Sequence, residues 1–126
     1  MILKNADIFD FDFNLRRADL RVEDGLIAEI GENLSGAEEH DLSGSVILPG
    51  FIDIHIHGCG GADFSDALPD TLETMSKTLA RFGVTSFCPA SMTLPYDRIE
   101  RAFERAAEYI GKESGAYIHG INMEGP

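Results

Sequence analysis

Two histidines stand one residue apart at the end of an apolar segment that runs from Pro49 to Gly58. Side chains alternate across a β-strand, so His55 and His57 would share a face with Asp53, while the three intervening isoleucines face the other way and suit packing beneath helices. Neutral imidazoles are the commonest metal ligands, and two on one face can share an ion. The spacing predicts a metal site at the carboxyl end of a strand, although an isolated His-x-His pair is weak evidence by itself.

Glu124 is the third candidate ligand, at the end of the last apolar segment. If residues 116–123 form a strand, alternation places Asn122 and Glu124 on one face, at the same end of the sheet as the histidine pair. Two imidazoles and one carboxylate leave coordination positions open for water, as in catalytic Zn²⁺ and Fe²⁺ sites. We therefore expect a divalent metal, Zn or Fe, at His55, His57 and Glu124.

The other histidines and the cysteines give weaker evidence of metal binding. His119 has the opposite parity to Glu124, so we expect a hydrogen-bonded or partly exposed side chain rather than a ligand. His40 lies among loop residues and is expected to face solvent. Cys59 is interpreted as a small loop residue, with metal ligation as the alternative. Two cysteines, Cys59 and Cys88, make no disulfide framework.

The elements that must position the candidate ligands change in character near residue 48. Short apolar segments separated by turn residues fill residues 1–48, where Asp24-Gly25 is a strong hairpin signal. We expect a small antiparallel, β-sandwich-like module there. Residues 49–126 instead alternate apolar segments with segments of helical periodicity. The expected strands are 51–57, 84–88 and 116–123, and the expected helices are 70–82 and 95–110. The apolar stripes expected to be buried are Leu72, Met75, Leu79 and Phe82 in the first helix and Ile99, Ala102, Phe103, Ala106 and Ile110 in the second.

Strand, helix, strand, helix, strand is a βαβαβ order, which predicts a parallel sheet with right-handed crossovers. The second strand is expected to stop before Pro89, which has no N–H for a sheet hydrogen bond. The predicted fold class is α/β, a small N-terminal antiparallel β module followed by the first βαβαβ part of a TIM-type (β/α)8 barrel. A complete barrel needs about 250 residues, so we expect a truncated barrel that covers its strand edges as a homo-oligomer.

The composition argues against two classes of partner. Among 126 residues, 22 are acidic and 10 are Lys or Arg, which gives a formal net charge of −12. Nucleic acid and anionic membranes attract concentrated positive charge, so neither is an expected partner. The N-terminus lacks the sustained apolar segment of a signal peptide, and we expect a cytoplasmic location.

Several segments resemble a known family. Residues 46–58 are similar to the first barrel strand of the metal-dependent amidohydrolase superfamily. Residues 58–64, 83–87 and 120–126 extend the similarity, more specifically, to the N-acetylglucosamine-6-phosphate deacetylases within it. The Met-Glu-Gly-Pro segment best distinguishes these deacetylases from their sister enzymes, because many sister enzymes instead bridge their metals with a modified lysine on the fourth strand.

The resemblance implies hydrolysis of the acetyl group of N-acetylglucosamine 6-phosphate, a small-molecule amino-sugar phosphate, to give glucosamine 6-phosphate and acetate. It implies that Glu124 is the principal metal ligand and that His55 and His57 bind a second, more loosely held ion. The expected number of metal ions is therefore one or two. Asn122 stands where other members often have histidine. The family's proton-transferring Asp, two further histidines and its phosphate-binding residues lie beyond Pro126, so the isolated chain is expected to be inactive.

Two alternatives remain open. Another amidohydrolase, dihydroorotase-like or dipeptidase-like, would share the first strand but lack a glutamate in the third-strand motif. A non-catalytic assembly module would merely retain the metal-site residues. A purified chain without bound Zn²⁺ or Fe²⁺, and without any loss on Glu124→Gln, would indicate the assembly module.

Overall fold

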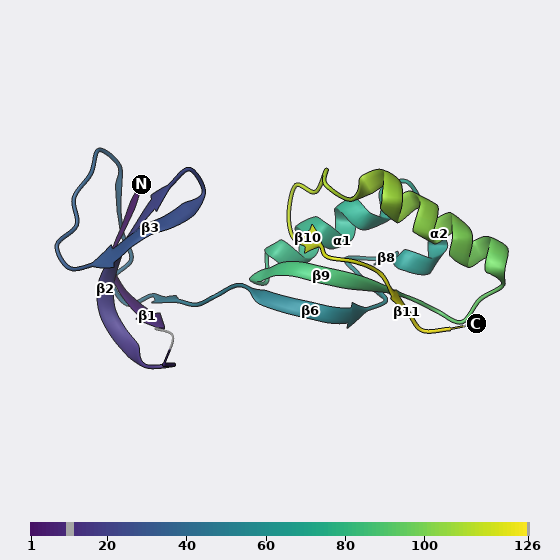
Figure 1. Ribbon diagram of the computed structural model, residues 1–126, viewed down its shortest axis with the longest axis horizontal. Helices are drawn as coiled ribbons and strands as arrows, with labels where there is room; N and C mark the ends of the chain where they lie inside the picture. The colour runs from purple at the N-terminus through teal and green to yellow at the C-terminus, as the bar shows by residue number, and fades with distance from the viewer. Residues whose placement is uncertain (10–11, 126) are drawn as a thin grey trace. The chain divides into compact units, whose positions relative to one another are not determined.

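The computed structural model describes residues 1–9 and 12–125. The chain forms two compact units, Met1–Pro49 and Gly50–Pro126 (Figure 1). The first unit is built of strands and the second combines strands with two α-helices, so the chain is an α/β protein. The strands of the first unit are β1 (Ile2–Phe9), β2 (Leu15–Glu23), β3 (Leu26–Gly31), β4 (Glu39–Asp41) and β5 (Val46–Ile47).

The first unit contains one sheet in the order β3–β2–β1–β4, and β5 also pairs with β1. β2 runs antiparallel to both β1 and β3, whereas β4 and β5 run parallel to β1. The sheet is therefore mixed, and the prediction of an antiparallel module was wrong for β4 and β5. Alternation of apolar residues is the same for both strand directions, so it reports the buried face and not the direction.

The hairpin predicted at Asp24-Gly25 is confirmed. β2 ends at Glu23 and β3 begins at Leu26, and the two residues between them have φ of +50° and +77°. Two successive positive φ values are typical of the type I′ turn, whose twist matches that of the flanking strands. The core cluster of this sheet consists of Ala6, Ile8, Ala18 and Leu20, and Ile2 of β1 is buried as well.

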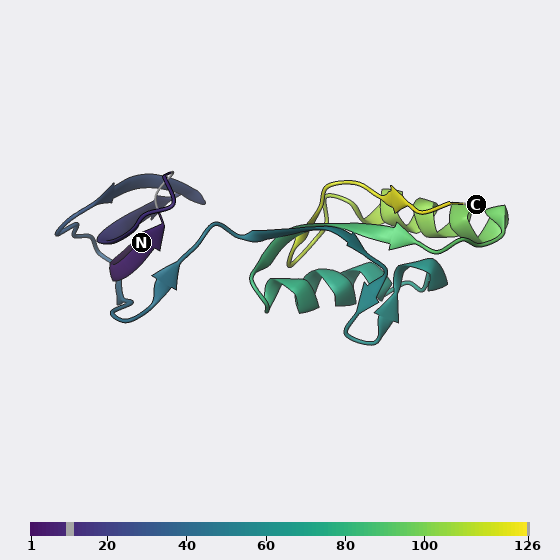
Figure 2. The same ribbon diagram turned by 90° about the horizontal axis from the view of Figure 1, so that it is seen from below.

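The second unit has one parallel sheet and two helices. β6, β10 and β11 each pair with β9 in parallel, as the βαβαβ order predicts. Figures 1 and 2 show β6 and β11 running alongside the long β9. The elements are β6 (Phe51–Ile56), β7 (Gly58–Cys59), β8 (Ala62–Asp63), the 3₁₀ turn η1 (Phe64–Asp66), α1 (Thr71–Ala80), β9 (Val84–Ser91), α2 (Tyr96–Tyr109), β10 (Tyr117–Ile118) and β11 (Asn122–Met123).

Both helices bury their apolar stripes in the same core. The predicted stripe of α1 ends earlier than expected, because the helix stops at Ala80 and Gly83 takes a φ of +79°. Phe82 therefore lies outside the helix and is 77% exposed, contrary to the prediction. Ile110 likewise follows the end of α2 and is exposed. The central core residues are Phe64, Leu72, Met75, Leu79, Phe87, Ala102, Ala106, Ala116 and Ile118.

β9 continues through Pro89, which the sequence predicted would end it. Its pairing with β6 is irregular between Asp53 and Ile56, just where Pro89 pairs. An irregular stretch of the ladder accommodates a residue without an N–H. The longer strand carries Ala90 and Ser91 to the end of the sheet where the histidines lie.

The third strand consists of two short pieces rather than one continuous strand over 116–123. Tyr117 of β10 pairs with Ser86, whereas Asn122 of β11 pairs with Ala90, so one extra residue is accommodated between the pieces. The shift changes which residues face the core, because strand side chains alternate. Ile121 packs against the core cluster just before Asn122 begins β11.

Only one of the three isoleucines of β6 packs as predicted. Ile56 contacts the core cluster, but Ile52 and Ile54 are 62% and 71% exposed. Within the described residues β6 pairs with β9 alone, so it forms an edge of the sheet that neither helix covers at these positions. Self-association through such an edge stays a prediction.

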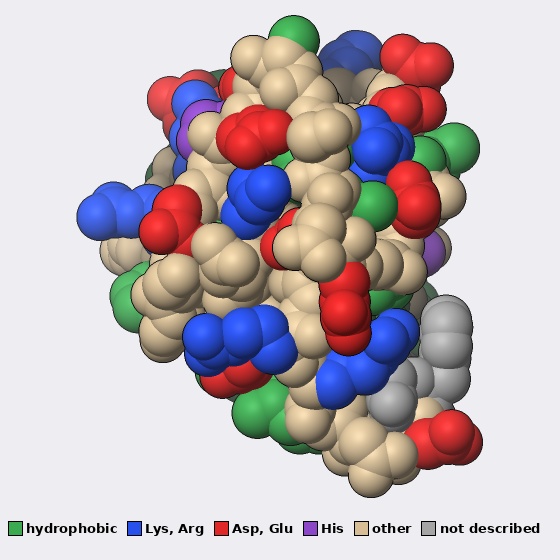
Figure 3. Space-filling view, turned by 90° about the vertical axis from the view of Figure 1, so that its left-hand side faces the viewer, with side chains coloured by type: hydrophobic (Ala, Val, Ile, Leu, Met, Phe, Trp, Pro, Cys, Tyr) green, Lys and Arg blue, Asp and Glu red, His purple; other side chains and the backbone are tan. Residues whose placement is uncertain are grey.

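Charged side chains of both signs are interspersed on the face drawn in Figure 3, so neither sign dominates it. In the described part of the chain, neither helix combines the length and the apolar character needed to cross a bilayer.

Candidate metal centre

The two predicted histidine ligands meet at the carboxyl end of β6. His55 lies within the strand and His57 directly follows it. Their Nε2 atoms are 3.3 Å apart, so alternation does place both rings on one face. The backbone of His57 is anchored as well, because its carbonyl accepts the N–H of Phe64 at 2.8 Å.

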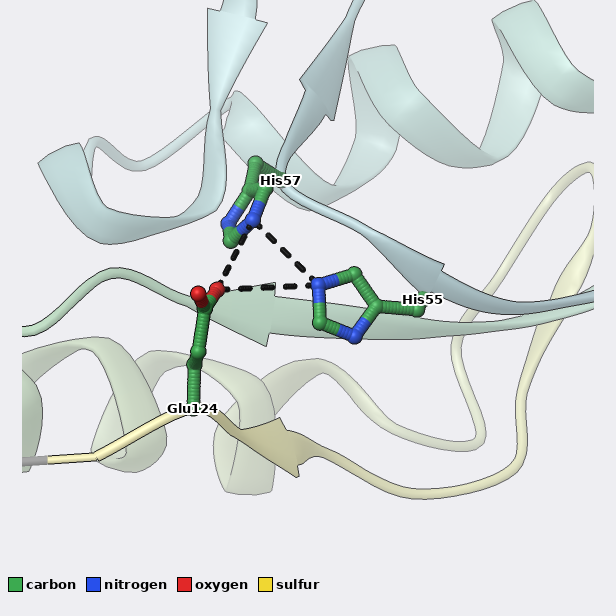
Figure 4. Close-up of side chains that lie close together, drawn as sticks. All are labelled: His55, His57 and Glu124. Carbon is green, nitrogen blue, oxygen red and sulfur yellow. Dashed lines mark hydrogen bonds and ion pairs between the residues drawn. The ribbon is translucent and has the colours of Figure 1, made fainter.

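Glu124 joins the pair from the loop that follows β11 (Figure 4). Its Oε2 atom lies 3.0 Å from His57 Nε2 and 3.6 Å from His55 Nε2. All three side chains are partly exposed, at 44% for His55, 34% for His57 and 47% for Glu124. The structure thus brings together the three residues that the sequence nominated, although two distant strands supply them.

His57 is oriented by a backbone acceptor on the neighbouring strand. Its Nδ1 lies 3.2 Å from the carbonyl oxygen of Ala90 in β9. A carbonyl can only accept, so Nδ1 carries the hydrogen and Nε2 of the neutral ring keeps its lone pair. That lone pair is available toward Glu124. Sequence patterns carry no signal for the Ala90 carbonyl, since every residue has one.

Asn122 contacts the other histidine. Its side-chain Nδ2 lies 3.1 Å from the carbonyl oxygen of Ile54 and 3.1 Å from His55 Nδ1. Parity placed Asn122 on the face of Glu124, but the residue pattern alone indicated no role for its side chain. Its position two residues before the candidate carboxylate is the feature of the sequence that could have indicated a role for Asn122 in the site.

The donor set fits a small divalent ion. The three candidate ligand atoms all lie within 4.8 Å of one another. Two ligands of a tetrahedral ion, each about 2.05 Å from it, are about 3.3 Å apart. The separations of 3.0, 3.3 and 3.6 Å fall around that value. Imidazole nitrogen and carboxylate oxygen are also the ligands that Zn²⁺ and Fe²⁺ take in open sites.

The other residues considered as candidates have partners of their own or face solvent. The Asp53 carboxylate accepts the backbone N–H of His55 at 3.1 Å. Burial, followed by the negative charge of Asp53, raises the pKa of the Cys59 thiol, which disfavours the thiolate that a metal needs. His119 is exposed. His40 is exposed as predicted but lies in β4 rather than in a loop, with its Nε2 3.1 Å from Glu38 Oε1.

A glycine-rich hairpin follows His57 directly. β7 and β8 pair antiparallel, with Gly58 opposite Asp63. A Cβ on Gly58 would lie 2.1 Å from the carbonyl oxygen of Ala62, so only glycine permits this approach. The hairpin positions the Phe64 N–H that binds the His57 carbonyl.

Comparison with known proteins agrees with the geometry. Residues 46–126 match the family described as "Amidohydrolase family". The chain is 31% identical to an N-acetylglucosamine-6-phosphate deacetylase of Lysinibacillus sphaericus, over 100% of this chain and 33% of the relative. It is 36% identical to an N-acetylgalactosamine-6-phosphate deacetylase of Escherichia coli O157:H7, over 85% of this chain and 28% of the relative.

A solved structure shows the same arrangement of elements. The crystal structure of N-acetylglucosamine-6-phosphate deacetylase from Pasteurella multocida superposes with a TM-score of 0.86 at 28% identity, covering 97% of this chain and 33% of that one. The chain spans about a third of the length of the relatives it matches. The family match covers more than half of the chain, and the chain therefore belongs to the amidohydrolase family.

Proposed function

We propose that His55, His57 and Glu124 hold a divalent metal, Zn or Fe, in a metal-dependent hydrolase. The observation that carries this proposal is the convergence of three ligand atoms, separated by 3.0 to 3.6 Å, from segments far apart in the sequence. Two imidazoles and one carboxylate leave coordination positions for water and substrate. A second ion at the histidine pair belongs to the same proposal.

The proposal includes a barrel. The first three strands of a (β/α)8 barrel would be β6, β9, and β10 with β11 as two pieces of the third strand. Residues 1–48 would be a partial β-sandwich-like module and residues 49–126 the barrel part. Parallel pairing and the position of the ligands at the carboxyl ends of the strands support this assignment. The full extent of such a barrel exceeds the length of this chain.

The proposed reaction is removal of the acetyl group from N-acetylglucosamine 6-phosphate, giving glucosamine 6-phosphate and acetate. The name of the Lysinibacillus sphaericus relative supports this substrate, and the Escherichia coli relative makes N-acetylgalactosamine 6-phosphate the second candidate. A divalent ion in such a site supplies polarisation of the amide carbonyl and a lowered pKa for water. The reaction is proposed for the protein at the full length of its relatives.

The residues of this chain would hold the metal ion and orient the side chains that ligate it. Glu124 contributes negative charge that balances a divalent cation. His57 presents the lone pair of Nε2, because its Nδ1 hydrogen is held by Ala90. The described residues provide the ligand end of the site, and the general acid and base is proposed to lie outside this chain.

Metal binding by the 126-residue chain tests the centre. Zn²⁺ is titrated in competition with a chromophoric chelator, for the wild type and for Glu124→Gln, which keeps the shape of the side chain but removes its charge. We expect binding that weakens at least a hundredfold in Glu124→Gln. Glu104→Gln, at an exposed position of α2, is the matched control and should bind as the wild type does. Equal affinity in all three proteins would refute the centre and favour the assembly module.

Acetate release tests the substrate. The full-length protein that carries this segment is assayed with N-acetylglucosamine 6-phosphate and with N-acetylgalactosamine 6-phosphate. The proposal expects turnover of the first above the second, with loss in Glu124→Gln. Release from neither sugar, together with hydrolysis of a cyclic amide, would favour a dihydroorotase-like enzyme.

A further inference from the structure

We infer that Asn122 is a positioning residue that makes the two histidines of the pair inequivalent. In this arrangement His57 presents a lone pair at the centre, and His55 presents an N–H. The inference rests on the proposed metal centre for its consequence, but the hydrogen bonds on which it depends are present in the chain itself.

The orientation of the Asn122 amide follows from its backbone partner. The carbonyl of Ile54 can only accept a hydrogen bond, so the side-chain nitrogen of Asn122, and not its oxygen, must face it at 3.1 Å. Amide orientation is assigned from such networks. The same nitrogen lies 3.1 Å from His55 Nδ1 and has a second hydrogen to donate there.

A donor at Nδ1 selects the opposite tautomer from the one in His57. When His55 Nδ1 accepts from Asn122, the hydrogen of the neutral ring is on Nε2. That Nε2–H points to the lone pair of His57 Nε2, 3.3 Å away. The chain of donors then runs from Asn122 through His55 and His57 to the Ala90 carbonyl, and each link has one donor and one acceptor.

One close contact in the cluster has no hydrogen between its two atoms when the hydrogens are placed in this way. His57 Nε2 and Glu124 Oε2 face each other at 3.0 Å, and both are acceptors. A cation between two acceptors removes their repulsion, so this edge of the cluster is where an ion binds first. His55 ligates through Nε2 only after its hydrogen moves to Nδ1, which the Asn122 donor opposes.

Substituting Asn122 by aspartate reverses this preference. A carboxylate accepts from Nδ1 and favours the tautomer that ligates, as carboxylate–histidine–metal arrangements do. The negative charge also attracts cations by itself, so a control for charge is needed. Met123→Asp adds the same charge at the next residue, whose side chain is 56% exposed.

The direct test is spectroscopic and needs no metal. The ¹⁵N-labelled 126-residue chain is stripped of metal and studied at about pH 8.5, well above the ordinary histidine pKa of about 6.5. Two-bond ¹H–¹⁵N correlations distinguish the tautomers. We expect Nε2–H at His55 and Nδ1–H at His57 in the wild type, and Nδ1–H at both in Asn122→Asp. Nδ1–H at His55 in the wild type, or the same tautomers in both proteins, would overturn the inference.

The second arm measures Zn²⁺ affinity by chelator competition. Groups that hydrogen-bond to ligating histidines typically change metal affinity by about 10- to 100-fold, so Asn122→Asp should bind Zn²⁺ at least about tenfold more tightly than Met123→Asp. Equal tightening in the two variants would mean that charge alone acts, which contradicts the positioning role. Failure of every variant to bind Zn²⁺ would refute the proposed centre, whereas the tautomers decide the role of Asn122 separately.

Discussion

The hydroxyl of Tyr109 donates a hydrogen bond to the carboxylate of Glu73 and so joins the end of α2 to the first turns of α1. Glu73 also accepts from Lys77 Nζ and, at 2.7 Å, from Ser114 Oγ. The bonds from Lys77, Tyr109 and Ser114, in that order of effect, lower the pKa of Glu73 from 4.5 to about 2. The ionised carboxylate is therefore an organising point between the two helices.

The first prediction concerns acid stability. Because folding lowers the pKa of Glu73, its stabilising contribution is present above pH about 4.5 and is lost as pH falls toward about 2. Glu73→Gln should have a lower melting temperature than the wild type at about pH 6, and the difference should shrink toward pH 2. Thermal unfolding followed by circular dichroism measures it. Glu100→Gln, at an exposed site on α2, should show no such convergence.

The second prediction concerns alkaline stability. Burial, and then the hydrogen bond and charge of Glu73, raise the pKa of Tyr109 from 10 to about 12. A raised phenol pKa means that the stabilising contribution is present below pH about 10 and is lost as pH rises toward 12. The wild type should have a higher melting temperature than Tyr109→Phe near neutral pH, and the difference between the two melting temperatures should shrink in this alkaline range. A constant difference would contradict the assignment, and Tyr117→Phe, 66% exposed, serves as the control.

The third prediction concerns the buried carboxylate of Asp19 in the first unit. Asp19 is 4% exposed, and its oxygens accept the backbone N–H groups of Asn5 at 2.8 Å and Leu34 at 2.9 Å. Asp19→Ala leaves both donors without this acceptor, which should cost about 2–4 kcal/mol of unfolding free energy. Urea denaturation measures the loss. Asp7→Asn breaks only a surface ion pair with Arg17 and should change stability by less than about 1 kcal/mol.

The fourth prediction concerns the hairpin beside His57. A methyl group at Gly58 would overlap the carbonyl oxygen of Ala62, and backbone must move to relieve the contact. We expect Gly58→Ala to destabilise the second unit by about 1–3 kcal/mol and to weaken Zn²⁺ binding, because His57 is the preceding residue. Gly120→Ala is the matched control, since a Cβ there meets no atom within 4 Å. Similar losses in the two variants would show that the close approach at Gly58 is unimportant.

Much of the fold and of the candidate site could be predicted because the signals are local. The turn at Asp24-Gly25 depends on two residues that tolerate positive φ. The shared face of His55 and His57 depends on alternation along a single strand. The helices and their buried stripes depend on a period of 3.6 residues, and the predictions failed only where the helices end, as at Phe82.

The amino-acid sequence by itself determined the parallel βαβαβ order and nominated His55, His57 and Glu124, because residue type and periodicity are carried by each segment separately. Only the tertiary structure decided the register shift between β10 and β11, the carbonyl that orients His57 and the amide that faces His55. Those relationships join residues on different strands. Their distances depend on how strands pair in space, and the periodicity of one strand contains no information about its register with another.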